Sequence, residues 1–133
     1  MANEAILRDR FSDPVDFTIY DTPGYLKGTL MKLSGARLVG AATANDDVFI
    51  GVLARDKISG DGRTQVPVYL DGIFDMYCDA NVVAITAGVQ VTISGANIIK
   101  IYTTLDEEKG FVVGRALEAG VAGSYGQVLV GGN

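Results

Sequence analysis

The sequence predicts an all-β fold, a small β-barrel or sandwich of about ten short strands. Short runs rich in β-branched and aromatic residues are separated by turn signals every 8–12 residues, which is typical of such folds. A hairpin-sized unit occurs twice along the chain. The composition is 48% hydrophobic, with 3 Pro and with 17 Gly that follow no collagen-like period, which indicates a globular protein rather than a disordered one.

The repeat is the strongest signal in the chain. Residues 26–39 return as residues 86–99, with a glycine, a β-run, Ser-Gly-Ala and a second β-run in the same order at an offset of 60. Each copy is followed by an apolar strand with one glycine, at 48–53 and 111–117, where the offset is 63. An internal repeat of this kind predicts a duplicated hairpin unit.

The first fourteen residues are set apart as an extended N-terminal arm. They interleave charged and apolar residues without β alternation, and chain ends are often mobile. Two interpretations stay open: a frayed terminus, or an arm that orders on a partner through Ile6, Leu7 and Phe11. Residues 15–133 are predicted to form a single β-domain.

The domain is predicted to begin with a half-buried strand over residues 15–20, because apolar and polar residues alternate strictly there. A turn at residues 21–24 follows, with Pro and Gly in turn positions. In each repeated hairpin, the glycine of Ser-Gly-Ala, Gly35 or Gly95, is expected to supply the positive φ of a short loop.

Further along, Pro67 predicts an edge strand or a bulge within residues 65–70, since proline cannot donate to a β-ladder. Asp71-Gly72 is expected to turn a hairpin into a strand over residues 73–77. Residues 105–109 are expected to form one helical turn within an acidic loop. The final strand is predicted at residues 127–130.

Composition narrows the functional classes. The net charge is −5 and the isoelectric point about 4.5, with no basic patch, so we expect no nucleic-acid partner. No window is long and apolar enough for a membrane helix, and the first residues lack the apolar core of a signal peptide, so we expect cytoplasmic synthesis and no membrane partner. One cysteine and no histidine exclude an intramolecular disulfide and the commonest general base.

No catalytic, cofactor-binding or metal-binding residues are predicted, and we expect the protein not to be an enzyme. Gly60-Asp-Gly-Arg63 lacks the further ligands of a calcium loop and the Gly-Lys-Ser/Thr of a phosphate loop, and is interpreted as a plain turn. Asp71 and Asp75 are interpreted as acids on an exposed sheet face that aid solubility. Cys78 is expected to be a partly buried, unactivated thiol.

Several short motifs in a fixed order carry a family resemblance. They are Lys27-Gly28 before a β-run, Phe49-Ile-Gly51, Asp61-Gly-Arg-Thr64, Asp71-Gly-Ile-Phe74, Thr86-Ala-Gly88 with alternating valines, Val113-Gly-Arg-Ala-Leu-Glu118 and Val128-Leu-Val-Gly-Gly132. From about residue 15 to residue 132 the sequence resembles the small capsid decoration, or cement, proteins of tailed bacteriophages and related viruses. The N-terminal lead departs from the pattern.

The resemblance implies a non-enzymatic structural protein on the outer surface of an assembled virion. It implies a trimer, often over local three-fold positions, that braces neighbouring major capsid proteins against internal DNA pressure. The expected partners are thus the major capsid protein and further copies of this chain, and no cofactor is implied.

Two functional hypotheses follow for the surface. As contacts to the capsid or to another subunit, we predict Ile6, Leu7 and Phe11 of the arm with the loop at residues 57–63, notably Lys57, Ile58 and Arg63. The alternative is a carbohydrate- or ligand-binding β-module. It would need an aromatic platform, for which Tyr69, Phe74 and Tyr77 are the only cluster close enough in sequence.

Overall fold

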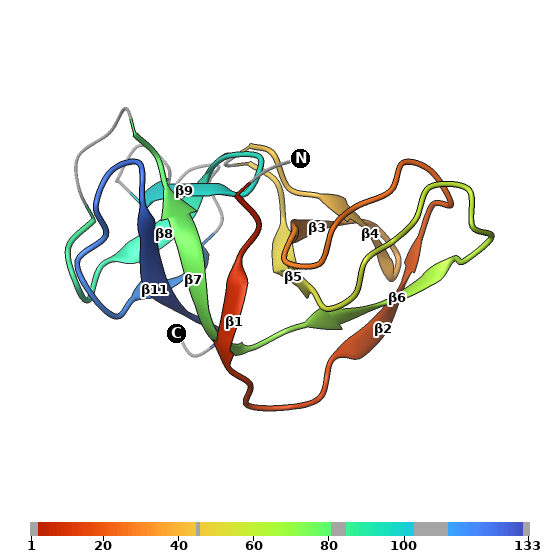
Figure 1. Ribbon diagram of the computed structural model, residues 1–133, viewed down its shortest axis with the longest axis horizontal. Helices are drawn as coiled ribbons and strands as arrows, with labels where there is room; N and C mark the ends of the chain where they lie inside the picture. The colour runs from red at the N-terminus through yellow and green to blue at the C-terminus, as the bar shows by residue number, and fades with distance from the viewer. Residues whose placement is uncertain (1–2, 45, 81–84, 103–111, 132–133) are drawn as a thin grey trace.

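The computed structural model describes residues 3–44, 46–80, 85–102 and 112–131 and shows eleven strands and no helix within them (Figure 1). The all-β prediction is therefore confirmed. The strands are β1 (Ile6–Asp9), β2 (Val15–Ile19), β3 (Leu30–Gly35), β4 (Leu38–Ala41), β5 (Phe49–Leu53), β6 (Gln65–Tyr69), β7 (Gly72–Cys78), β8 (Gln90–Gly95), β9 (Ile98–Ile101), β10 (Val112–Ala116) and β11 (Tyr125–Val130). None of the described segments is a helix that could span a membrane.

The strands form two five-stranded barrels of the same topology. The first is closed in the order β2-β4-β3-β5-β6, and the second follows the order β7-β11-β10-β8-β9. Each barrel closes through one parallel pair, β2 with β4 and β7 with β9, while the other pairs are antiparallel. The predicted hairpin duplication is thus part of a larger one, because the strands before and after each hairpin unit are repeated as well.

The two hairpins share one register. Lys32 pairs with Gly40 in the first barrel, and Thr92 pairs with Lys100 in the second. The prediction that glycine supplies the positive φ is wrong: Arg37 (φ 57°) and Asn97 (φ 59°) adopt it instead. Gly35 and Gly95 still pair with the returning strands, at a register shift, so the left-handed residue falls two positions later.

The barrels share part of their core. One buried cluster lies inside the first barrel and includes Met31 and Val39. The other fills the second barrel but also takes in Leu30 and Val52 from the first. Successive side chains of a strand point to opposite faces, so β3 buries Met31 in its own barrel and Leu30 against the second. This two-sided burial explains why apolar and polar residues alternate less cleanly in the first repeat.

The N-terminal arm is docked on the chain's own body. β1 pairs antiparallel with the first half of β7, with Leu7 opposite Phe74, while β9 pairs with the second half of β7. Just before β1, the N–H of Ala5 donates to the carbonyl of Gly28 at 2.8 Å. A Cβ on Gly28 would lie 2.3 Å from the Ala5 oxygen, so glycine is required at this crossing. Residues 6–9 are thus a paired strand, neither a frayed end nor a free arm.

Two local predictions around β6 are wrong. β6 lies between β2 and β5, so it is not an edge strand, and neither of its pairings shows a register shift, so Pro67 carries no bulge. Pro67 falls beyond the last β5 pair, Leu53 with Val68, and its carbonyl accepts from the Ala54 N–H at 2.9 Å. Asp71-Gly72 does not turn a hairpin, because β6 and β7 belong to different barrels and this segment connects them. The helical turn predicted at residues 105–109 lies outside the described residues.

Candidate functional site

The six predicted contact residues do not form one surface. In the arm, Ile6 and Phe11 are exposed, whereas Leu7 packs against the core of the second barrel. In the loop before β6, Ile58 and Arg63 are exposed. β1 lies on the second barrel, and that loop projects from the far side of the first (Figure 1).

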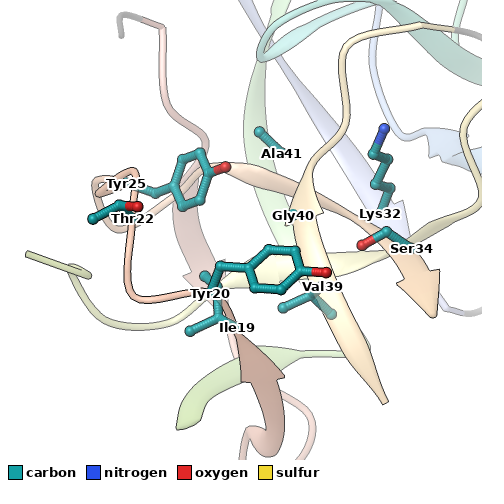
Figure 2. A pocket seen from close by; sticks show the side chains of 9 residues that line it. All are labelled: Ile19, Tyr20, Thr22, Tyr25, Lys32, Ser34, Val39, Gly40 and Ala41. Atoms are coloured by element: carbon teal, nitrogen blue, oxygen red, sulfur yellow. The ribbon is translucent and has the colours of Figure 1, made fainter. Parts of the chain in front are cut away.

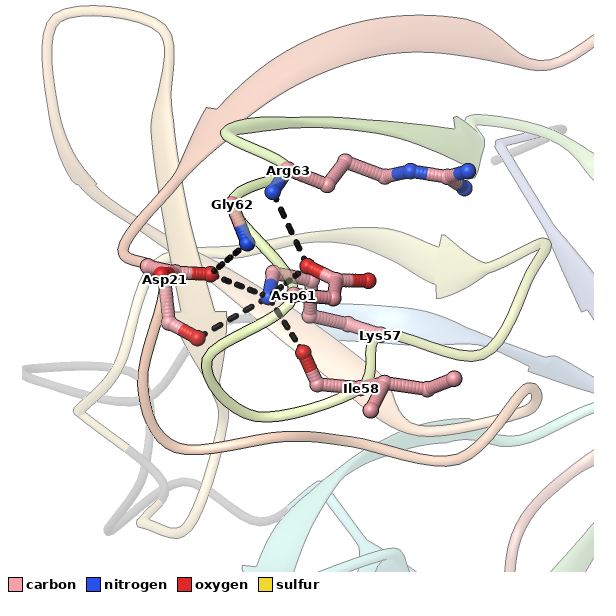
Figure 3. Close-up of polar contacts among 6 residues, drawn as sticks. All are labelled: Asp21, Lys57, Ile58, Asp61, Gly62 and Arg63. Atoms are coloured by element: carbon pink, nitrogen blue, oxygen red, sulfur yellow. Dashed lines mark hydrogen bonds and ion pairs between the residues drawn. The ribbon is translucent and has the colours of Figure 1, made fainter.

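Lys57, the sixth residue, is buried rather than available for contact. Its side chain is 0% exposed, and its Nζ donates to Oδ1 of Asp21 at 2.9 Å and to Oδ1 of Asp61 at 2.7 Å (Figure 3). It also donates to the carbonyl oxygens of Asp21 at 2.9 Å and Ile58 at 2.6 Å. A buried ammonium needs this degree of compensation, since burying an unpaired charge is costly. Lys57 is therefore a structural anchor of the loop.

Burial and the neighbouring negative charges have opposite effects on the pKa of Lys57. Burial lowers the pKa of Lys57, but the hydrogen bonds and negative charges of Asp61 and Asp21 raise it more, so the pKa lies above its ordinary value. The hydrogen bond from Lys57, with a second from the backbone N–H of Arg63, holds the pKa of Asp61 below its ordinary value. Both groups are therefore charged across the neutral range.

The anchored loop presents Ile58 to solvent, with 67% of the residue exposed. The second barrel has the same feature at an offset of 63, where Val121 is 64% exposed. Each residue begins an equivalent turn: Asp61 N–H donates to the Ile58 carbonyl at 3.3 Å and Ser124 N–H to the Val121 carbonyl at 3.0 Å. We call Ile58 and Val121 the tip residues. Sequence analysis missed Val121, although the 63-residue offset between the repeats would have located it.

The glycines of these turns are also equivalent. Gly60 and Gly123 have φ values of 76° and 77°. Asp61, the acid of Gly60-Asp-Gly-Arg63, is engaged by Lys57 and by the Arg63 N–H. Among the described residues there is no group of three or more acidic, cysteine or histidine side chains that could hold a metal ion.

The three aromatic residues expected to form a platform are separated. Tyr69 and Phe74 contact each other, with ring centroids 5.9 Å apart. Phe74 belongs to the core of the second barrel, and Tyr69, partly buried, packs against that core. Tyr77 instead packs edge-to-face on Tyr125 at 5.6 Å. These three side chains therefore offer no common flat surface to a ligand.

The acids and the cysteine of β7 have structural partners. Asp75 is buried and forms an ion pair with Arg8 of β1 at 2.5 Å, so its expected place on an exposed sheet face is wrong. Asp71 accepts a hydrogen bond from Ser12 Oγ at 2.8 Å. Burial raises the pKa of the Cys78 thiol, as expected of an unactivated cysteine.

A groove of about 270 Å³ lies on the first barrel, beside the strand pair β3–β4 (Figure 2). Two tyrosines, a lysine, a serine and a threonine surround a short stretch of β4. We call this groove the tyrosine groove. Its lining residues are Ile19, Tyr20, Thr22, Tyr25, Lys32, Ser34, Val39, Gly40 and Ala41. No motif in the sequence pointed to it, because its sides come from three separate segments.

Comparison of the chain with models of protein families and with curated proteins found no match. The functional interpretation therefore depends on the geometry described above and on the motif order of the sequence.

Proposed function

We propose that this protein is a non-enzymatic structural component of a virion that binds the outer surface of an assembled capsid. It would stabilise the shell by bridging neighbouring major capsid proteins. The observation that carries the proposal is the pair of tip residues, because two barrels of one topology each expose a β-branched side chain at the same turn. A body with two equivalent apolar contacts suits a surface built from repeated subunits. The motif order of the sequence supports the same assignment.

The tip residues are rigidly placed, which favours a binding role. In the first barrel, Lys57 fixes the turn that carries Ile58, and Gly62 N–H donates to Asp21 Oδ1 at 2.9 Å. Preorganised contacts lose little conformational entropy when they bind. The second turn is held by hydrogen bonds between Cys78 and residues 123 and 124.

Bridging by many copies needs only modest contacts. Two linked contacts on one lattice act by avidity, and binding only the assembled shell stabilises that state by mass action. We propose that the protein is made in the host cytoplasm and acts as a homotrimer on the virion surface. Its net charge of −5 favours solubility at the high copy number this role requires.

The test is occupancy on purified capsids that lack this protein. We expect Ile58→Ser and Val121→Ser each to weaken binding about tenfold, because each removes one apolar contact. The double variant should bind more weakly still. Val48→Ser, which changes an exposed valine outside both turns, is the matched control. Wild-type occupancy by the folded double variant would contradict the proposal, as would failure of the wild-type protein to bind shells.

The arm contacts are tested in the same assay by the double substitution of Ile6 and Phe11 with serine. A deletion of residues 1–13 is less informative, because it also removes the partner strand of β7. Reduced occupancy would place the exposed arm residues in the contact surface. Unchanged occupancy would restrict that surface to the tip residues.

A further inference from the structure

The starting observation is a glycine in β4 that the fold does not require. Gly40 lies within the strand, opposite Lys32, and is not among the glycines with left-handed φ. The nearest atom to a Cβ built on it is Ser34 Oγ, 3.9 Å away, so a larger residue would fit. Glycine inside a strand weakens it, which is acceptable where a strand end bends or where something must approach the backbone closely.

The second barrel provides an internal comparison. At the register position equivalent to Gly40 it has Lys100, opposite Thr92. The same backbone therefore accepts a long side chain at this position. In the first barrel the glycine leaves open space over β4, and Val39, Gly40 and Ala41 form the floor of the tyrosine groove there.

The side chains around the groove suit a ligand that contains a ring bearing polar groups. Tyr20 follows the last residue of β2, Ile19, which pairs with Val39 beside Gly40, and 68% of the Tyr20 residue is exposed. Because it is so exposed, Tyr20 is not simply a cross-strand ring packed down on the glycine. Figure 2 shows its ring extended across the mouth of the groove, with Tyr25 on one side and Lys32 with Ser34 on the other.

The polar groups present both donors and acceptors. The hydroxyls of Thr22, Ser34 and the two tyrosines can each donate and accept, and Lys32 donates. Lys32 is in contact with Asp47 Oδ1 at 3.4 Å, so its charge is partly balanced. A groove that combines aromatic faces with a few polar groups is typical of sites for small ligands.

We propose that the tyrosine groove binds a saccharide, with the apolar face of a sugar ring on Tyr20 and its hydroxyl groups bonded to Ser34, Lys32 and Tyr25. The volume of about 270 Å³ is suited to one or two sugar rings. A proline-rich peptide would occupy a longer aromatic groove, whereas only two aromatic side chains line this one. This site is separate from the tip residues and does not depend on the proposed capsid role.

The test is a glycan array followed by titration calorimetry with the best-bound oligosaccharide, using the isolated full chain. We expect Gly40→Lys, which copies the second barrel, to abolish binding, and Tyr20→Ala to weaken it about tenfold. Ala36→Lys adds the same side chain at the exposed β3–β4 turn and should bind as the wild type does. Circular dichroism verifies that each variant is folded.

Three results would overturn the inference. One is an array without any bound saccharide. Another is a saccharide bound equally well by wild type and folded Gly40→Lys. The third is occupation of the groove by a peptide from a peptide array without saccharide binding. Because no capsid is present in these assays, their outcome is independent of the occupancy experiment.

Discussion

At the residue scale, Lys57 shows how a local sequence can mislead about exposure. The segment around it is polar and glycine-rich, which predicts a solvated loop. Lys57 is buried because one of its acids, Asp21, comes from 36 residues earlier in the chain. A local sequence pattern cannot reveal Asp21 as a partner of Lys57, whereas it can reveal Asp61, which lies four residues after Lys57.

Replacing Lys57 with methionine should destabilise the protein. The variant keeps the length of the side chain but leaves two carboxylates facing each other without a cation, and breaking a buried ion pair by removing one partner is strongly destabilising. We expect the Tm to fall by about 5 °C or more in a thermal unfolding experiment. Lys27→Met, at an exposed lysine of the same barrel, is the control and should leave the Tm nearly unchanged.

The same cluster predicts a pH dependence. The pKa of Asp61 is held below its ordinary value of 3.8, so its ionised form stabilises the folded state above that pH. That contribution is lost as the pH falls through the lower, folded-state pKa. The difference in Tm between wild type and Asp61→Asn should therefore be constant from pH 7 to about pH 5 and shrink below pH 3.8.

At basic pH, Lys57 has the opposite dependence, because its stabilising contribution is lost as the pH rises. The pKa of Lys57 is raised above its ordinary value of 10.5, so its contribution is complete below that pH and is lost as the pH rises through the higher value. A Tm difference that grew on acidification, or that changed between pH 5 and pH 9, would contradict this account of the cluster.

At the element scale, the two β-hairpin turns are equivalent in backbone and different in role. Arg37 lies on the surface with its guanidinium 4.8 Å from the centre of the Phe17 ring. Asn97 is buried, and its Oδ1 accepts the backbone N–H of Leu30 at 3.0 Å. One copy of the turn therefore faces solvent, and the other joins the barrels.

Alanine at these two positions should have unequal effects. Both substitutions place alanine at a positive φ, so that strain is common to the pair. Asn97→Ala also leaves the buried Leu30 N–H without its acceptor, which costs about 1–3 kcal/mol. Arg37→Ala loses an exposed cation–π contact, worth about 0.5–1 kcal/mol. It also loses the hydrogen bond from the guanidinium to the Asp16 carbonyl at 2.6 Å, which is exposed, so water can replace the donor and no buried group is left unpaired. Urea denaturation of both variants measures the difference, and equal losses would show that Asn97 does not join the barrels.

The elements that the sequence predicts well are those set by neighbouring residues. The repeated hairpins follow from alternation and from glycines a few positions apart, so β3, β4, β8 and β9 were expected close to where they lie. β1 was not expected, because it has no alternation and gains its hydrogen bonds from β7, some 66 residues away. The closing parallel pairs and the connector between β6 and β7 depend on similarly distant partners.

The candidate sites divide in the same way. Ile58 was predicted as a contact residue because it lies in a polar loop. Val121 could have been predicted too, since it lies 63 residues later, at the offset between the repeats. The tyrosine groove could not be predicted from the sequence, because Tyr20 and Lys32 become neighbours only when β2 pairs in parallel with β4. The predicted cluster of Tyr69, Phe74 and Tyr77 was wrong, although the three are close in sequence. Side chains alternate along β7, so Tyr77 lies on the opposite side of the strand from Phe74 and Met76, which are buried.

At the scale of the whole molecule, the barrels are not independent, because Leu30 of the first contributes to the core of the second. Leu30→Ala should therefore destabilise both barrels together, by about 2–5 kcal/mol. Calorimetry should show one unfolding transition, shifted to lower temperature. The single β-domain predicted for residues 15–133 requires this cooperativity, and two separate transitions would contradict it.

The matched control for this experiment is Leu26→Ala, which shortens an exposed leucine. Its effect on stability should lie within about 0.5 kcal/mol, as is usual for surface substitutions. A comparable loss in both variants would mean that the Leu30 effect does not report on the shared core.

The pairing of β1 with β7 has a consequence for the nascent polypeptide. The first barrel uses strands that end at Tyr69, so it is complete in the emerging chain before β7 has been synthesised. β1, although it is synthesised before the strands of the first barrel, must wait for β7 before it finds its hydrogen-bonding partner. Translation thus imposes an order in which β1 docks only after the complete first barrel that follows it has left the ribosome.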